Sequence, residues 1–267
     1  MKRWKLASLV GVLLLAMASS GCSKLKARDQ LNKGVVAFRG AQFQEAIDHF
    51  QQAAALDPKL LDARLYLAMS YFQMYAPGAQ SPDNLKVAHQ AIDAFEKVLE
   101  LDPTNNTALA YIGLLYYHIP DPDKAKEFEQ RRLQADPNNP EPYYWIGVID
   151  WNLCHANDDD LRRGDPKLTT PDAQGNPPPL PEKLRTKLAE ENSKLIDEGL
   201  QALQKAVDLK PNYNDAMAYL NLLYRQKADI EQDSSSRAAD IKAANDWLAK
   251  ALQARRQATS GGSTGGT

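Results

Sequence analysis

Cysteine is scarce in this sequence, which has only two, Cys22 and Cys154, among its 267 residues. Small secreted domains that depend on disulfides instead carry many cysteines at short spacings. Two cysteines are too few for such a framework, so a disulfide scaffold is excluded.

Patterns for catalysis and for phosphate binding are also missing. The glycines form no phosphate-binding loop, because they stand at isolated positions or in the final Gly/Ser-rich stretch. Three of the four histidines, His49, His89 and His118, have no serine, cysteine or paired carboxylate at a spacing that suggests catalysis. The sequence therefore predicts no catalytic residue, and we do not expect an enzyme.

One cluster resembles a metal-ligand set, namely Cys154-His155 followed by Asp158–Asp160. A thiolate, an imidazole and carboxylates could together bind a borderline metal. Neighbouring residues on a helix point ~100° apart, however, and no second Cys or His pair completes a site. We therefore interpret Cys154 as a partly buried thiol at a helix end, and predict no metal and no cofactor. A metal site or an active site at Cys154/His155 is the alternative.

The apolar run at the start of the chain is too short to span a membrane. Leu6–Ala18 contains 13 apolar or small residues, whereas a helical span needs ~20. The run follows the basic stretch Met1–Lys5, and this order is typical of a secretory signal. Two endings fit the pattern: cleavage after Ala18, or a lipoprotein-type ending at Cys22.

Ser20-Gly21-Cys22 resembles the end of a bacterial lipoprotein signal, in which the cysteine becomes the acylated first residue. Ser19 stands where that pattern usually has leucine. The resemblance implies a signal peptide over residues 1–21, a lipid anchor at Cys22 and a tether over residues 22–26. Ser23, in place of an aspartate, further implies an outer-membrane lipoprotein of the bacterial cell envelope that faces the periplasm.

Positive charge is not in excess. The chain has 32 Lys and Arg against 34 Asp and Glu, and loss of Lys2, Arg3 and Lys5 with the signal leaves 29 against 34, a net charge of −5. An acidic balance argues against nucleic acid as the partner and against a polybasic lipid-binding patch. We therefore expect a protein or peptide partner and no nucleic acid.

The sequence does contain a repeated residue pattern. Ala46 precedes Phe50 by four residues and Pro58 by twelve, and Ala91, Phe95 and Pro103 repeat this spacing. A small residue, a bulky residue and a closing proline describe a helix with one apolar face that ends before the proline. The twelve-residue spacing recurs in four segments: Ala46–Pro58, Ala91–Pro103, Ala125–Pro137 and Gly199–Pro211. Four copies predict an array of helical repeats, which is a binding architecture.

With 34 residues as the basic repeat length, counting back from the prolines places repeats at 27–60, 61–105, 106–139, 140–213 and 214–258. This register resembles the tetratricopeptide repeat (TPR), a helix-turn-helix unit of 34 residues. The family places small residues at its eighth and twentieth positions, which here are Gly34, Ala68, Gly113, Gly147 and Asn221, then Ala46, Ala91, Ala125, Gly199 and Ala244. The resemblance implies an all-α fold: a right-handed TPR-like helical solenoid of about five repeats.

The fourth repeat is lengthened by an insertion at about residues 152–191. Its first part, Asn157–Leu180, is polar and lacks a helical period, so we predict a loop. Pro181–Lys210 has apolar residues at three- and four-residue steps, which predicts one long helix. Residues 259–267, rich in Gly and Ser, are predicted to be a flexible tail.

Three local details are also predicted. Ser81 should cap a helix that begins at Pro82, and Ser234–Ser236 should form a turn. In the third repeat, Glu129 and Arg132 stand where the second helix should be apolar. We therefore expect Lys124–Ala135 to be the least protected helix of the array.

The resemblance implies where a partner binds, because the first helix of each repeat lines the concave face in this family. The groove positions carry an apolar and aromatic stripe: Val35, Phe38, Met69, Phe72, Leu114, Tyr117, Tyr144, Val148, Trp151 and Leu222. The alternative is that this stripe packs between neighbouring first helices. The Lys and Asn residues with which chaperone-tail-binding members clamp a carboxylate are absent here.

The sequence thus predicts a membrane-anchored envelope scaffold that binds a protein or peptide through the concave face of a TPR array. The alternative is a structural subunit of an outer-membrane assembly or secretion machine. The partner and the oligomeric state are left open.

Overall fold

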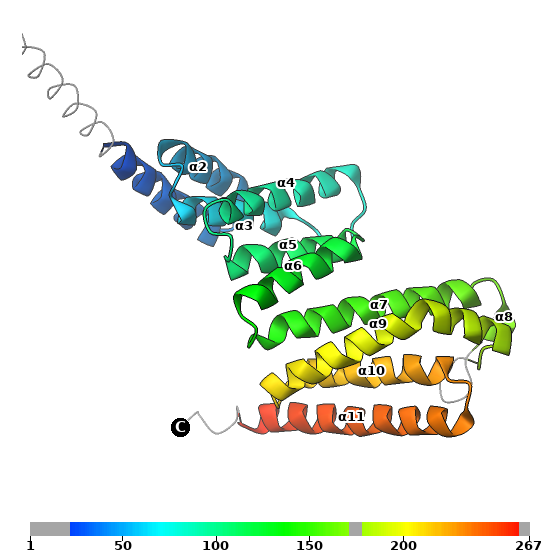
Figure 1. Ribbon diagram of the computed structural model, residues 1–267. Coiled ribbons are helices and arrows are strands. Elements are labelled where there is room, and N and C mark those ends of the chain that lie inside the picture. Colours follow the sequence, from blue (N-terminus) through cyan, green and yellow to red (C-terminus); the bar gives the residue numbers. More distant parts are fainter. Residues whose placement is uncertain (1–21, 171–177, 262–267) are drawn as a thin grey trace, which may run out of the picture. The chain divides into compact units, whose positions relative to one another are not determined.

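The computed structural model describes residues 22–170 and 178–261, and within those ranges every regular element is a helix (Figure 1). This confirms the predicted all-α class. The predicted signal peptide, residues 1–21, lies outside the described residues. The chain divides into two compact units whose boundary in the sequence falls between Phe128 and Glu129.

The helices follow one another in the pairs that the repeat register predicts. Residues 22–39 are helical and precede α2 (Phe43–Leu56), α3 (Leu61–Met74), α4 (Pro82–Leu99), α5 (Asn106–His118) and α6 (Pro122–Ala135). Then come α7 (Pro140–Arg162), the single turn α8 (Pro166–Thr169), α9 (Glu182–Leu209), α10 (Asn214–Ile230) and α11 (Ser234–Gly261).

Side chains with oxygen acceptors fix several helix starts. The Ser81 hydroxyl accepts a hydrogen bond from the Asn84 backbone N–H (3.3 Å), and Pro82 is the first helical residue of α4, as predicted. Asn105 and Asn139 cap α5 and α7 in the same way. Each cap satisfies a backbone donor that has no partner inside its helix.

Close approach within a repeat depends on glycine at the eighth position. A Cβ on Gly34 would lie 2.5 Å from the Phe50 ring, and a Cβ on Gly147 would lie 2.3 Å from Cγ of Leu203. Real Cβ atoms do not come so close to other carbons, so only glycine lets these bulky side chains seat against the first helix. Both contacts join the eighth position to the bulky residue four after the twentieth. The long insertion in the fourth repeat does not disturb this pairing.

Within the second unit, α7 packs on α9, and α10 packs on α7, α9 and α11. The core between these helices includes Leu188, Ile196 and Leu203 of α9 together with Leu220 and Leu223 of α10. The predicted long helix Pro181–Lys210 is therefore confirmed as α9, and its first half packs against the extended end of α7 rather than projecting into solvent.

The predicted loop Asn157–Leu180 is partly wrong, because α7 continues through the acidic run to Arg162. Arg162, one helical turn after Asp158, offsets the charge of that carboxylate at 2.8 Å, and His155 lies 3.6 Å from Asp159. Gly164, at φ 88°, follows the helix end and turns the chain toward α8.

Three other expectations are corrected toward the chain ends. Ser234–Ser236 is the first turn of α11 rather than a separate turn. The Asp233 carboxylate accepts hydrogen bonds from the Ser235 hydroxyl (2.5 Å) and from the Ser236 backbone N–H (2.8 Å), and these bonds lower the pKa of Asp233 to about 2. The predicted tether is helical from Cys22 onward. Helix α11 takes in the first residues of the predicted tail, and residues 262–267 lie outside the described ranges.

Helix α6 buries two charged residues where the repeat expects apolar ones. Glu129 is 3% exposed and Arg132 is 2% exposed. Arg132 donates to Glu129 (2.7 Å) and to Glu141 at the start of α7 (2.9 Å). A charged residue can stay buried when it is paired in this way, so these two residues form a polar contact between helices instead of a gap in the core.

Candidate functional site

In the first unit, the predicted groove residues are partly buried and contact other rings. Phe38 lies edge-on to Phe43 (centroids 5.6 Å apart) and to Tyr66 (5.8 Å), and Phe72 packs on Tyr111 at 4.6 Å. None of the six is fully enclosed, and all retain some exposed surface: Val35, Phe38, Met69, Phe72, Leu114 and Tyr117. The stripe in this unit therefore serves helix packing and keeps an accessible edge.

In the second unit the predicted groove residues separate into two kinds. Val148 is only 1% exposed and belongs to the core. Tyr144, Trp151 and Leu222 are partly exposed along the seam between α7 and α10. The structure thus leaves three of these four side chains able to contact a ligand.

A row of aromatic rings runs along this seam. Tyr213 lies 5.1 Å from Tyr144, Tyr144 lies 5.7 Å from Tyr219, and Tyr219 lies 5.4 Å from Trp151. The His155 imidazole then stacks on the Trp151 indole, with centroids 5.1 Å apart and planes 15° apart. These contacts hold the Trp151 ring in one orientation and leave part of it exposed.

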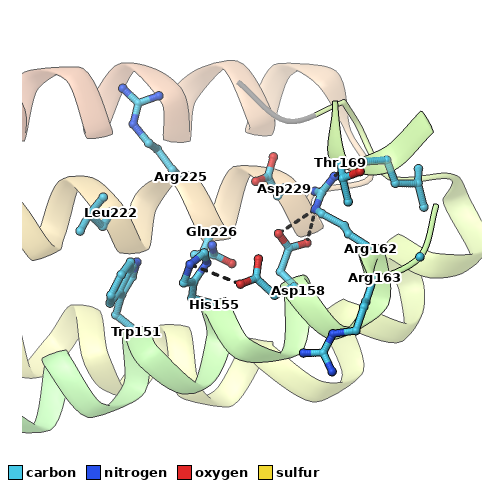
Figure 2. A pocket seen from close by; sticks show the side chains of 13 residues that line it. Trp151, His155, Asp158, Arg162, Arg163, Thr169, Leu222, Arg225, Gln226 and Asp229 are labelled. Carbon is cyan, nitrogen blue, oxygen red and sulfur yellow. Dashed lines mark hydrogen bonds and ion pairs between the residues drawn. The ribbon is translucent and has the colours of Figure 1, made fainter. Parts of the chain in front are cut away.

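Next to Trp151 opens a cleft of about 670 Å³, which Figure 2 shows between α7, α10 and the segment that follows α7. We call it the α7/α10 cleft. Trp151 and Leu222 lie at one end, and Asp158, Arg162 and Asp229 lie at the other end, near Thr169 (Figure 2). Its lining residues are Trp151, His155, Asp158, Asp159, Arg162, Arg163, Gly164, Leu168, Thr169, Leu222, Arg225, Gln226 and Asp229.

The insertion builds the polar end of this cleft, and Arg162 holds it there. Arg162 Nε donates to both carboxylate oxygens of Asp158 (2.9 and 2.8 Å), and both side chains are buried. Its Nη1 donates to the carbonyls of Leu168 (3.2 Å) and Pro178 (2.7 Å). One guanidinium therefore ties both ends of the segment after α7 back onto that helix.

Asp229, at the polar end, has a single ion pair among the described residues. Arg237 Nη2 donates to its Oδ1 at 3.3 Å. Burial, and next the negative charge of Asp158, raise the pKa of Asp229 above its ordinary value. On the same helix, Gln226 Oε1 is buried and has no hydrogen-bond partner among the described residues. The α10 side of the cleft thus offers two hydrogen-bond acceptors.

Cys154 and His155 do not act together in this structure. Cys154 is 0% exposed in the core, where its carbonyl accepts a hydrogen bond from Asn192 Nδ2 at 3.0 Å. His155 faces the α7/α10 cleft instead (Figure 2). The described residues contain no group of three or more His, Cys, Asp or Glu side chains that could hold a metal ion. Cys154 lies in the middle of α7, not at its end as expected.

Trp151 and Leu222 were predicted from their repeat positions, and His155, Asp158 and Asp159 only as part of a possible metal-ligand set, whereas Arg162, Gln226 and Asp229 were not predicted. Helical spacing from Trp151 and from Leu222 would have identified the remaining lining residues. On α7, His155, Asp158 and Arg162 lie four, seven and eleven residues after Trp151. On α10, Gln226 and Asp229 lie four and seven residues after Leu222. Because residues from Asn157 onward were predicted to form a loop, the end of α7 was not considered as a helix face.

Cys22, the predicted lipidation site, is exposed on the helix over residues 22–39. The segment that would identify it as a lipoprotein cysteine lies outside the described residues. Among the helices that the structure describes, none combines the length and the hydropathy that a membrane crossing requires.

Comparison with known proteins gives matches in structure only. No protein-family model matches the sequence, and no curated protein matches it. A crystal structure of MamA matches with a TM-score of 0.57 at 16% identity, over 88% of this chain and 94% of that one. MamA from Desulfovibrio magneticus RS-1, residue 41 to its end, matches with a TM-score of 0.55 at 18% identity, over 87% and 96%. YrrB, a TPR protein with an unusual peptide-binding site, matches with a TM-score of 0.52 at 16% identity, over 85% and 90%.

Proposed function

Because the chain has the tetratricopeptide-repeat fold, we propose that it is a scaffold that binds a protein or peptide through the first helices of its repeats. Repeat proteins present side chains of successive helices as an extended binding surface. The observation that carries the proposal is the α7/α10 cleft, where a fixed, partly exposed Trp151 lies at one end and the buried pair Asp158 and Arg162 at the other. A concave site with an aromatic anchor and a few placed polar groups is typical of ligand recognition.

We further propose that the scaffold acts at a membrane surface, attached through a lipid on Cys22. The lipoprotein-like end of the predicted signal and the exposure of Cys22 support this. The environment is then the bacterial envelope, with the repeats facing the periplasm. No catalytic step is assigned, and the mechanism is equilibrium binding by a tethered protein.

Photo-crosslinking in intact cells tests the binding proposal. A benzophenone amino acid at His155 or Leu222 should capture the same partner, whereas the label at Gln201, exposed on α9, should capture none of it. With that partner purified, Trp151→Ala should weaken binding by roughly 30-fold, as loss of an interface hot spot of ~2 kcal/mol does. Gln201→Ala is the matched control.

Thermal unfolding of each variant separates binding from stability. If Trp151→Ala lowers the melting temperature sharply while the folded fraction binds normally, Trp151 is a packing residue. The α7/α10 face would then have no part in the function. Capture at Gln201 as strong as at His155 would contradict the proposal equally.

A further inference from the structure

The α7/α10 cleft contains charged groups of both signs, so its preference depends on which of them are already paired. Arg162 is committed to Asp158 and to two backbone carbonyls. Arg163 pairs with Asp160 at 2.5 Å, and Arg225 donates to Asn245 on α11 at 3.1 Å. In Figure 2 the Arg225 side chain points away from Asp229. Arg162 Nε and Nη1, Arg163 and Arg225 are thus each committed to another group.

The acceptors facing the cleft are less completely paired. Asp229 has one long contact, from Arg237 at 3.3 Å, and Gln226 Oε1 has no partner among the described residues. Asp159 reaches His155 at 3.6 Å, and both of these side chains are about half exposed. On the α10 side of the cleft, hydrogen-bond acceptors therefore outnumber the donors that reach them.

The shape of the cleft fits a long side chain with a cationic end. The Trp151 ring and Leu222 provide an apolar end, and the acceptors lie deeper toward α8 (Figure 2). Leu222 and Asp229 are seven residues apart on α10, which is ~10 Å along the helix axis. An extended lysine or arginine can lay its methylenes on Trp151 and place its head near Asp229.

We infer that the α7/α10 cleft binds a basic side chain, lysine or arginine, presented by the protein or peptide partner. The inference rests on the proposed function and names the ligand chemistry of that site. The methylenes of that side chain lie against Trp151 and His155, and its cationic head donates to Gln226 Oε1 and Asp229. Its N–H groups supply the hydrogen bonds that Gln226 Oε1 and Asp229 would otherwise make to water. Asp229 then binds both this cation and Arg237.

Other ligand classes fit less well. A carboxylate or phosphate would face Asp158, Asp159 and Asp229, and the arginine nearest to them, Arg162, already serves three acceptor groups. A purely apolar side chain would bury Asp229 and Gln226 further without giving either of them a donor, which is costly. Charge complementarity therefore favours a cation.

Matched small probes test this without the partner. Nα-acetyl-arginine amide and Nα-acetyl-citrulline amide have nearly the same shape and differ in charge. Binding is followed by NMR shifts of the Trp151 indole N–H, assigned with Trp151→Phe. We expect at least a tenfold preference for arginine amide over citrulline amide, and Nα-acetyl-lysine amide should also bind better than its Nε-acetylated form.

Substitutions then test which side chains of the cleft bind the cation. Asp229→Asn and Gln226→Leu should each weaken arginine-amide binding about tenfold, while Asp197→Asn, the same charge change on an exposed part of α9, should not. Melting curves check that each variant is folded, and Gln226→Leu serves if Asp229→Asn is unstable.

Equal binding of arginine and citrulline amides overturns the inference, as does a preference for Nα-acetyl-glutamate amide. If the crosslinked partner still binds through His155 and Leu222 in that case, the proposed function stands and only its ligand chemistry is wrong.

Discussion

Arg132 has its side chain almost fully buried and joins two carboxyl groups, Glu129 of α6 and Glu141 of α7. Burial, which outweighs the neighbouring Arg132, raises the pKa of Glu129 from 4.5 to about 7. In the folded protein this carboxyl therefore keeps its proton at pH values where the unfolded chain has lost it. The charge of Glu141, which Arg132 also contacts, favours the protonated form as well.

We predict that stability falls as the pH rises from about 4.5 to 7, because the folded state binds the extra proton only across that window. Glu129 contributes at most about 3 kcal/mol to this change, at 1.36 kcal/mol per pKa unit. Glu129→Gln should flatten the dependence, since an amide keeps a hydrogen bond to Arg132 and does not titrate. Denaturant unfolding at pH 5 and pH 8 measures the difference.

The control for this prediction is Glu127→Gln, an exposed carboxyl on the same helix. It should leave the pH dependence of the wild type unchanged. Other groups titrate in this range too, so only the difference between wild type and variant isolates Glu129. Parallel curves for wild type and Glu129→Gln would show that Glu129 is ionised throughout.

At the scale of single elements, the described parts of the segment after α7 are held mainly by side-chain contacts, since their regular structure is the single turn α8. Leu168 and Leu180 are buried, and Arg162 binds the carbonyls of Leu168 and Pro178. Gly164, Leu168 and Thr169 of this segment line the α7/α10 cleft. The guanidinium that binds the segment is itself held by a buried ion pair, Asp158 with Arg162.

We predict that Arg162→Met destabilises the protein by about 3–5 kcal/mol, because it leaves Asp158 buried without its counter-ion. Arg163→Met changes the adjacent, exposed arginine and should cost little. Hydrogen exchange should speed up over residues 165–170 in the first variant only. Unchanged exchange there would show that the buried leucines hold the segment without Arg162.

The sequence predicts some of these elements well and others poorly, for a physical reason. The fold follows from local signals, such as the spacing of Ala46, Phe50 and Pro58, because a small residue and a proline act within their own helix. The helical course of Asp158–Asp160 depends on partners one turn away and on carbonyls of a later segment. A polar run is judged to be a loop when those partners are not known.

The same reasoning applies to the candidate site. Trp151 and Leu222 were predicted from repeat positions, since each repeat uses the same face of its first helix. Gln226 and Asp229 were missed because their importance comes from burial beside the insertion, which no repeat position encodes. Glu129 and Arg132 looked like weak points of α6, and their contact with Glu141 appears only when α7 is in place.

For the whole molecule, attachment through Cys22 would place the repeats beside a membrane and restrict where they meet a partner. We predict that Cys22→Ser moves the protein from the membrane fraction to the soluble fraction or leaves it unprocessed, because two or three acyl chains anchor a protein stably in a bilayer. Lys24→Ala, two residues away, should remain membrane-bound. Fractionation and mass spectrometry of the mature N-terminus measure both outcomes, and an N-terminus at Ser19 would contradict lipidation.

The pairing of Gly147 with Leu203 also has a kinetic consequence. Gly34 and Phe50 make the equivalent contact across 16 residues of chain, whereas Gly147 and Leu203 are 56 residues apart. Closing the longer loop costs about 1 kcal/mol more entropy, since each doubling of loop length adds ~0.6 kcal/mol. If closure limits the rate, the fourth repeat pairs its helices several times more slowly than the first. The insertion that completes the α7/α10 cleft would then make that cleft one of the last features to form during folding.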